Sequence, residues 1–326
     1  MISGPSERLP ARGRRRFRGS GILLLDKPVG PTSHDAVAAV RRALGTRRVG
    51  HFGTLDPFAS GLLVCGAGGA TRLAPFAADH ERTYRGTVRL GWRSTTDDPE
   101  GELEAAAGAT PPSRDDVERA CRAWVGEVGQ VPPAYSAKHL SGARAYARAR
   151  AGERFVLPEA RIMIRSIVIE RYVYPELDLQ VTCGPGTYIR ALARDLGEAL
   201  GVGGYCAALR RERTGPFAVG EAVVWEALPD WVAVRAALLP AESVVVHLPV
   251  AELDAAGQIA AVQGRSLPLP DGLPPDSSWV RLRGPVGFIG LAEVRDGSRL
   301  QPRRILTPGD GAVFRKGRPS VGETER

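Results

Sequence analysis

Apolar residues in the first part of the chain follow two spacings, one typical of strands and one typical of helices. Residues 21–25 form a short apolar run that Asp26 ends, so we expect a buried strand there. Apolar positions from Ser33 to Leu44 recur at helical spacing, which predicts a helix capped by Ser33. Alternate positions over residues 84–90 indicate a half-buried strand.

The same two patterns continue in the middle of the chain. A helix is predicted over residues 113–124, where a serine and an aspartate three residues apart form an N-terminal capping pair. Alternation over residues 177–183 predicts another strand, and helical spacing over residues 188–200 predicts another helix. Arg190 and Arg194 lie off the apolar stripe of that helix, so we expect Arg190 on its exposed side.

The composition changes near Pro240, where we place a domain boundary. Beyond it, short apolar runs separated by turns, with Asp296-Gly297 as a hairpin signal, indicate a small β-barrel. Because strands and helices alternate irregularly before Pro240, an α+β fold with a mixed sheet fits better than a doubly wound parallel sheet. We expect a disordered basic tail, a large domain, a barrel and a short tail, over residues 1–20, 21–240, 244–315 and 316–326.

The formal net charge of +8 is concentrated at the N-terminus. Residues 1–20 hold six arginines and one glutamate, which gives +5 for this tail and leaves +3 for the rest of the chain. Two explanations stay equally open. The tail is either an electrostatic tether for a polyanion or a solvated segment that aids solubility.

Neither a membrane nor an export signal is indicated. No apolar run approaches the roughly 20 residues that a membrane-spanning helix needs, and the run over residues 21–25 is too short for a signal peptide. The four cysteines lie far apart without a CxxC pair, which argues against a metal site and favours a reducing compartment. We therefore expect a cytoplasmic protein.

Two stretches that suggest ligands have simpler explanations. Asp97, Asp98 and Glu100 form an acidic cluster, but the sequence around them is typical of a solvated turn rather than of a metal site. Residues 66–71 superficially resemble a dinucleotide-binding turn, yet the third glycine is missing and Pro75 interrupts the helix that should follow. We expect no metal and no nicotinamide cofactor.

The stretch from Gly50 to Leu63 contains the strongest candidate for chemistry, Asp56. Its glycines permit a close approach of the backbone to a ligand, and Pro57 restricts the backbone beside the aspartate. Such a carboxylate can be a nucleophile, a general base or a helix cap, and Asp-Pro is also a common turn former. Spacing alone does not decide between these roles.

Six motifs, in order along the chain, resemble the TruB family of pseudouridine synthases. Residues 50–63 resemble the family's signature, in which the aspartate of a GxLDPxAxG run is catalytic. Phe52 departs from that signature, because bacterial members usually carry a small polar residue there. The other five motifs lie at residues 23–28, 82–85, 131–138, 186–190 and 209–211. The resemblance is strong from Gly21 to Phe217 and weak beyond.

This resemblance implies a reaction and the residues that perform it. A pseudouridine synthase breaks the bond from uracil N1 to C1′, rotates the base and rejoins it through C5. Asp56 would be the ionised catalytic carboxylate, as nucleophile or as the base that deprotonates the sugar, and Arg190 would keep it ionised. The implied substrate contacts are Tyr84 and Tyr188 at the flipped base, Leu209 in the pocket, His51 at the vacated position, and Lys27 at a phosphate or the N-terminal turn.

The resemblance also implies a fold, a substrate and the absence of a cofactor. The fold would be a catalytic domain with a mixed, largely antiparallel sheet flanked by helices, followed by a small PUA-like, RNA-binding β-barrel. The bacterial-type motifs point to uridine 55 in the TψC loop of tRNA. We expect a monomer without an obligatory protein partner. The alternative is a tRNA-binding or tRNA-folding protein in which binding, rather than modification, is the main role.

Overall fold

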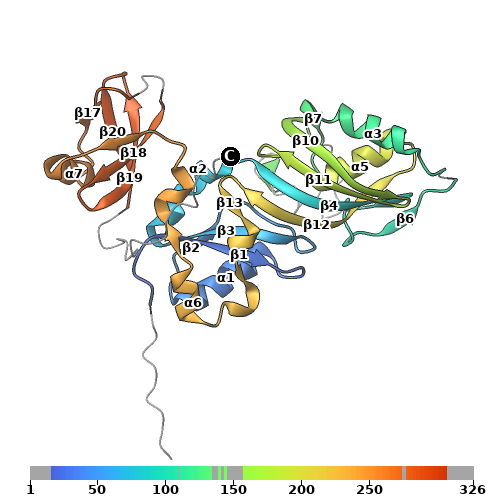
Figure 1. The fold of residues 1–326 in the computed structure, drawn as a ribbon, viewed down its shortest axis with the longest axis horizontal. Coiled ribbons are helices and arrows are strands. Elements are labelled where there is room, and N and C mark those ends of the chain that lie inside the picture. The colour runs from blue at the N-terminus through green and yellow to red at the C-terminus, as the bar shows by residue number, and fades with distance from the viewer. Residues whose placement is uncertain are drawn as a thin grey trace, which may run out of the picture.

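The computed structural model describes residues 16–306 except residues 109, 134–138, 141–142, 145–156 and 274–276. A long domain built on one large sheet carries a small domain at one end, formed by the last strands (Figure 1). Among the described residues, no helix is both long and apolar enough to cross a membrane. Outside the described residues lie 1–15 of the predicted N-terminal tail, 134–138 of the mid-domain motif, 274–276 and 307–315 of the predicted barrel, and the whole predicted C-terminal tail, 316–326.

The large sheet is mixed and largely antiparallel, which confirms the expected fold class. Its strands are β1 (Gly21–Lys27), β2 (Val49–His51), β3 (Ser60–Ala67), β4 (Arg82–Leu90), β7 (Gly126–Gln130), β10 (Ala160–Val173), β11 (Glu176–Cys183), β12 (Gly204–Thr214), β13 (Phe217–Ala218), β14 (Val223–Val224) and β15 (Leu239–Pro240). The main order is β14-β1-β3-β12-β4-β11-β10-β7. Only the β12–β3 and β1–β14 pairs are parallel among the described strands of this sheet.

Two short hairpins stand apart from the large sheet. They pair β5 (Trp92–Ser94) with β6 (Leu103–Ala105), and β8 (His139–Leu140) with β9 (Ala143–Arg144). The loop between β5 and β6 is important for the site. It carries Asp97, Asp98 and Glu100, the acidic cluster for which the sequence predicted a solvated turn.

Three predicted helices cover one face of the sheet. These are α1 (Ser33–Leu44), α3 (Arg114–Ala123) and α5 (Ile189–Ala199), and α6 (Trp231–Ala236) contacts α1. Their apolar stripes meet the sheet in one buried cluster, which includes Val40, Val117 and Leu192 together with Leu23 and Leu25 of β1. The 3.6-residue periodicity therefore placed these helices correctly.

The cap of α1 differs from the prediction by one residue. Thr32, not Ser33, is the N-cap, and it forms a reciprocal capping pair with Asp35. The Ser33 side chain points inward instead, where it contacts Leu55. A hydroxyl at the first turn of a helix can cap the helix or hydrogen-bond to a neighbouring loop. In the folded chain the Ser33 hydroxyl bonds to the loop.

The opposite face of β1 and β3 packs against short helical segments and the small domain. The segments are η1 (Gly68–Leu73), α2 (Ala74–Ala78) and η4 (Ala241–Val245). Phe76 of α2 meets Trp279 of the small domain edge to face, with ring centroids 4.9 Å apart. Arg72 donates to the backbone oxygen of Ile305 at 2.6 Å. The two domains therefore share one apolar cluster.

The small domain is a five-stranded sheet of PUA-like character. It contains β16 (Val250–Glu252), α7 (Ala255–Val262), β17 (Leu267–Pro268), β18 (Trp279–Gly284), β19 (Gly287–Arg295) and β20 (Arg299–Ile305), with strand order β16-β18-β19-β20-β17. Asp296 and Gly297 both have positive φ in the turn that joins β19 and β20. The predicted hairpin is thereby confirmed.

The last residues of the predicted N-terminal tail belong to the folded domain. The backbone N–H of Phe17 donates to the oxygen of Leu44 at 2.8 Å, and Phe17 packs against the core. Ser20 is buried, and its hydroxyl accepts from the backbone N–H of Gly69 at 2.9 Å. Residues 16–20 were therefore assigned wrongly to a disordered tail.

Candidate active site

Asp56 lies in the loop between β2 and β3, and buried polar side chains hold the backbone of this loop. The Ser33 hydroxyl donates to the oxygen of Leu55 at 2.9 Å and accepts from its N–H at 2.8 Å. Arg211 of β12 donates to the oxygens of Gly53 and Thr54 at 3.0 and 3.2 Å. On the other side of Asp56, the oxygen of Pro57 accepts from the N–H of Gly30 at 2.8 Å, so the backbone that directs the Asp56 carboxylate is held from both ends.

Arg190 is the cation that Asp56 faces. Its Nε lies 3.0 Å from Oδ2 of Asp56, whose side chain is 36% exposed. The Arg190 side chain itself is only 5% exposed, so the expectation that it lies on the exposed side of α5 was wrong. The residue is off the apolar stripe because it faces a buried carboxylate rather than solvent.

That buried carboxylate is Asp98, which the sequence analysis assigned to a solvated turn. Asp98 is 3% exposed, and its Oδ2 lies 2.8 Å from Nη1 of Arg190. Its Oδ1 accepts from the Thr96 hydroxyl at 2.5 Å and from the N–H of Glu100 at 3.0 Å. The turn interpretation was therefore wrong for Asp98. The one available signal was that Asp98, like Asp56, precedes a proline.

Asp97 extends this network to the next turn of α5. Its carboxylate lies 2.9 Å from Nη1 of Arg194, and Arg194 also donates to the oxygen of Val131 at 2.8 Å. Two successive aspartates thus bind two arginines one turn apart on the same helix. The β5–β6 loop is fastened to α5 by these ion pairs.

The electrostatic environment of Asp56 is balanced between burial and charge. Burial raises the pKa of the Asp56 carboxyl above its ordinary value, while the Arg190 charge and, more weakly, Lys27 oppose that rise. The Asp98 charge adds to the rise. Arg190 is therefore the largest influence that keeps Asp56 ionised.

A cleft of about 370 Å³ opens over this pair and brings together most of the predicted site. Its lining includes Asp56, Arg190, Tyr84, Tyr188 and Leu209, which come from four different segments of the chain. Tyr84 and Leu209 lie on adjacent strands, β4 and β12. The cleft combines an ion pair with aromatic and apolar walls, which suits a planar, uncharged ring.

The backbone of Tyr188 is held by a residue that the sequence analysis did not single out. Gln130 at the end of β7 is 1% exposed. Its Oε1 accepts from the N–H of Tyr188 at 2.9 Å, and its Nε2 donates to the oxygen of Tyr188 at 3.1 Å. This two-way contact fixes the residue from which α5 starts. Gln130 precedes the mid-domain motif directly, which was the signal that could have found it.

Two predicted substrate contacts do not line the cleft. Lys27 is fully buried, and its ammonium donates to the oxygens of Pro28 and Pro31 at 2.8 Å each. Of the two roles left open, the structure therefore gives Lys27 the turn rather than a phosphate. Burial also lowers the pKa of Lys27 to about 8, against the opposing charge of Asp56. His51 lies half-buried on β2, where it pairs with Cys65 of β3.

The chain is similar to known pseudouridine synthases along most of its length. The family model for the N-terminal domain of TruB family pseudouridylate synthase matches residues 41–189. The models for the tRNA pseudouridylate synthase B C-terminal domain and for the C-terminal part of pseudouridine synthase II TruB match residues 190–246 and 249–306.

Individual relatives support the same grouping. The tRNA pseudouridine synthase B of Thermobifida fusca (strain YX) is 44% identical over 288 residues, which cover 85% of this chain and 96% of the relative. That of Leifsonia xyli subsp. xyli (strain CTCB07) is 45% identical over 285 residues, covering 85% and 93%. Among solved structures, a chain of a Cbf5-Nop10-Gar1 complex aligns with a TM-score of 0.70 and 25% identity, covering 89% of this chain and 86% of that chain.

Proposed function

The chain belongs to the TruB family of pseudouridylate synthases, and from this we propose that it converts uridine 55 in the TψC loop of tRNA to pseudouridine. Relatives that are 44% and 45% identical over most of the chain carry the name tRNA pseudouridine synthase B. The Asp56–Arg190 pair at the base of an aromatic cleft is the observation that carries the proposal.

Asp56 is the carboxylate on which the reaction depends. The N1–C1′ bond of the uridine must break, and the freed base must turn before C5 bonds to C1′. Both mechanisms considered for the aspartate, attack as a nucleophile and removal of a proton from the sugar, require it to be ionised. The Arg190 guanidinium 3.0 Å away supports that ionised form, and the partial exposure of Asp56 leaves the carboxylate accessible from the cleft.

Asp98 acts on Asp56 through Arg190. It binds one side of the guanidinium at 2.8 Å, and the backbone oxygen of Thr96 accepts from the same nitrogen at 2.9 Å. An arginine fixed by these contacts presents Nε to Asp56 in one orientation. Asp98 is therefore a positioning residue, because it touches the arginine and not the reacting atoms.

The walls of the cleft hold the flipped base. Tyr84 and Tyr188 offer aromatic surfaces and Leu209 offers an apolar one. All three line the same cleft as Asp56. Extruding a base from its stack costs a few kcal/mol, which stacking contacts in the pocket offset. These contacts favour a role in catalysis over a role in tRNA binding alone.

One substitution separates catalysis from binding. Asp56→Asn keeps the shape of the side chain and removes the charge, so tRNA affinity should persist while pseudouridine formation disappears. Both are measured on tRNA transcripts, by filter binding and by tritium release from C5-labelled uridine. Turnover that survives the substitution would refute the proposed role of Asp56. An Asp56→Asn variant that no longer modifies the T loop but still refolds tRNA would establish tRNA folding as a second function.

The small domain supplies the second part of the proposal. We expect the small domain to bind RNA. The apolar cluster that it shares with the large domain holds it against that domain, which carries the cleft. A chain that ends at Ser243 should bind tRNA more weakly while the chemical step on bound RNA changes little. Equal affinities of the shortened and full chains would refute a role for this domain in binding.

A further inference from the structure

A second large groove lies at the C-terminal end of α1, away from the catalytic cleft. Its volume is about 1610 Å³, and it shares no lining residue with the cleft. Ser33 at the other end of α1 contacts the Asp56 loop, so the 12-residue helix separates the two sites by about 18 Å. The groove is lined by the end of α1 and the loop after it, by α6, and by Arg16 and Trp225.

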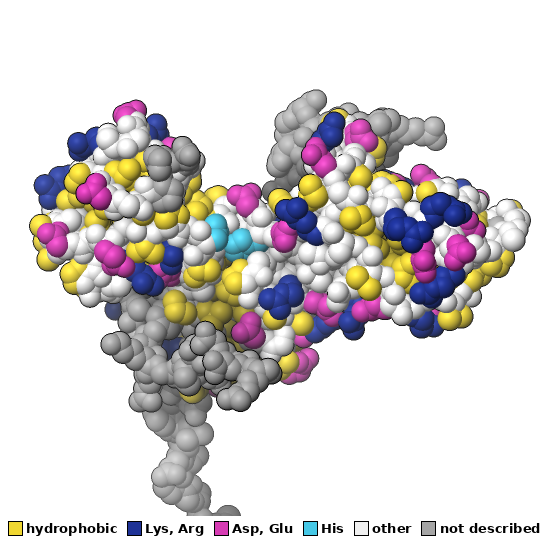
Figure 2. All heavy atoms as spheres, turned by 45° about the horizontal axis from the view of Figure 1, so that its top comes forward, with side chains coloured by type: hydrophobic (Ala, Val, Ile, Leu, Met, Phe, Trp, Pro, Cys, Tyr) yellow, Lys and Arg dark blue, Asp and Glu magenta, His cyan; other side chains and the backbone are white. Residues whose placement is uncertain are grey.

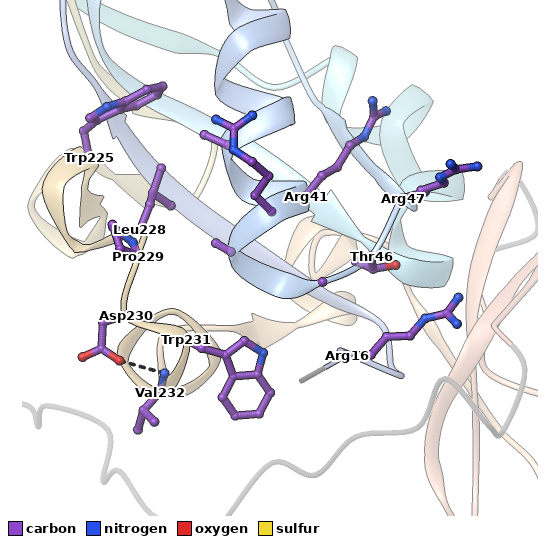
Figure 3. Close-up of a pocket in the computed structure, with 14 residues that line it drawn as sticks. Arg16, Arg41, Thr46, Arg47, Trp225, Leu228, Pro229, Asp230, Trp231 and Val232 are labelled. Carbon is purple, nitrogen blue, oxygen red and sulfur yellow. Dashed lines mark hydrogen bonds between the residues drawn. The ribbon is translucent and has the colours of Figure 1, made fainter. Parts of the chain in front are cut away.

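The two sides of this groove differ in chemistry. Arg16, Arg41 and Arg47 lie along one side, and Trp225, Leu228 and Pro229 along the other (Figure 3). Trp231 of α6 also lines the groove, and Arg42 adds a fourth arginine. A basic wall therefore faces an aromatic and apolar one.

The groove has a strong positive charge that acidic side chains do not neutralise. Four arginines line it against one acid, Asp230. The Asp230 carboxylate is occupied as the cap of α6, where it accepts from the N–H groups of Val232 and Ala233 at 2.8 and 3.1 Å. The net charge favours an anionic occupant.

The arginines of the groove differ from those elsewhere in the molecule. Arg41 donates to the oxygen of Val49 at 2.9 Å. For Arg16, Arg42 and Arg47, the part of the chain that the structure describes provides no ion pair. On the open face of the sheet, by contrast, Arg85 and Arg171 each pair with carboxylates. The groove arginines are exposed and have charge to offer a ligand.

The combination of arginine and tryptophan selects among anions. Guanidinium groups bind phosphate oxygens in a bidentate manner, and indole rings stack on unpaired bases. An acidic peptide would pair with the arginines only where it carries carboxylates, whereas every nucleotide of a single strand supplies both a phosphate and a stacking ring. A duplex would not present the faces of its bases. The Arg235 guanidinium lies 5.2 Å from the Trp231 ring centroid and supports that ring.

We propose that this groove is a second RNA-binding site, which takes a single-stranded segment of the same tRNA whose T arm enters the catalytic cleft. The proposal rests on the function proposed above. A tRNA held at the cleft has a high effective concentration at a groove about 18 Å away, so a weak contact there adds to the affinity.

Two RNAs and two matched double variants test this site. Arg42→Glu with Arg47→Glu reverses the groove charge, and Arg119→Glu with Arg122→Glu makes the same change on α3, where both side chains are highly exposed. Fluorescence anisotropy is measured with full-length tRNA and with the isolated T-arm stem-loop at several salt concentrations. The groove variant should bind full-length tRNA about tenfold more weakly, with a log–log salt slope smaller by about 1.4, which is about 0.7 for each lost phosphate contact of a single strand.

The remaining results are equally specific. The groove variant should bind the stem-loop like the wild type, and the α3 variant should bind both RNAs like the wild type. Trp231→Leu should weaken only full-length tRNA, about fivefold, without changing the salt slope, because a stacking contact releases no counterions.

The proposal would be overturned by equal losses for both RNAs, by equal losses in the two double variants, or by a groove that binds a free uridine octamer without contributing to tRNA affinity. Pseudouridine formation in the stem-loop is followed in parallel. If the wild-type protein forms no pseudouridine in the stem-loop, the proposed function is refuted. If the groove variant binds tRNA like the wild type and its turnover is normal, only the groove proposal is refuted.

Discussion

Two Asp-Pro turns meet at one arginine, and they differ in almost everything but sequence. Asp56-Pro57 lies between β2 and β3, and its carboxylate is 36% exposed to the cleft. Asp98-Pro99 lies between β5 and β6, and its carboxylate is 4% exposed and saturated with hydrogen bonds. Access, rather than residue type, therefore separates the carboxylate that we propose to react from the one that we propose to hold the arginine in place.

The comparison is tested most strongly by removing the charge of the accessible carboxylate. Asp56→Asn should lower turnover by at least about 10³-fold, because the reactive group is lost. Stability should stay within about 1 kcal/mol, since burial disfavours the charged form of Asp56 and Arg190 keeps its pair with Asp98. Single-turnover assays and urea unfolding measure the two effects. A large loss of stability in Asp56→Asn would show that Asp56, like Asp98, is needed to hold Arg190, which would contradict the difference between the two turns.

Removing the shared arginine should affect both turns at once. Arg190→Met leaves Asp98 buried without its cation, so unfolding should become easier by about 3–5 kcal/mol. Turnover should fall by about 10²–10³-fold, as when a fixed electrostatic contact is lost. Arg194→Met is the matched control on the next turn of α5, because its partner Asp97 is less deeply buried. Equal stability losses in both variants would contradict the special burial of the Arg190 site.

The concealed carboxylate should matter for positioning. Asp98→Asn keeps one acceptor oxygen for Arg190 but removes the charge and places an amide NH2 beside the N–H of Glu100, so turnover should fall about tenfold while tRNA affinity stays unchanged. The measurement is kcat and KM on tRNA transcripts, with Asp97→Asn as the control. A change confined to KM would argue for contact with RNA instead of an effect through Arg190.

The pH profile should distinguish Arg190 from Asp98 by the sign of the change that each makes in the pKa of Asp56. Asp56 must be ionised to act, and burial raises its pKa, so wild-type activity should be lost on acidification above the pH at which an exposed aspartate titrates. Arg190→Met removes the main opposing charge, so the acid limb should move to higher pH. Asp98→Asn removes a charge that raises the pKa, so the limb should move to lower pH. Shifts in the same direction for both variants would contradict this electrostatic account.

The smallest expected effect concerns the support of the exposed turn. Ser33→Ala removes the hydroxyl that contacts both backbone groups of Leu55, so unfolding should become easier by about 1–3 kcal/mol, with a several-fold loss of turnover. Thr32→Ala, which removes the helix cap, should cost about 1 kcal/mol and leave turnover unchanged. Equal effects on turnover would show that the helix itself, not the loop contact, positions Asp56.

Local sequence determined the elements and the order of the motifs. Periodicity located α1, α3, α5, β4 and β11, because an element that buries one face must repeat its apolar residues with its own period. The ordered motifs identified the family and, within it, Asp56, Arg190, Tyr84, Tyr188 and Leu209, which the structure brings to one cleft.

Only the tertiary structure decided which charges are buried and what they touch. Asp98 resembled a solvated turn residue and Arg190 an exposed one, because the partner that makes burial favourable lies 92 residues away in the chain. Lys27 likewise turned out to be buried against the backbone of its own turn, and Ser33 to hold the backbone of Leu55, which lies 22 residues away. A buried ion pair is stable only when both partners arrive together. That condition belongs to the folded chain and leaves no periodic trace in the sequence.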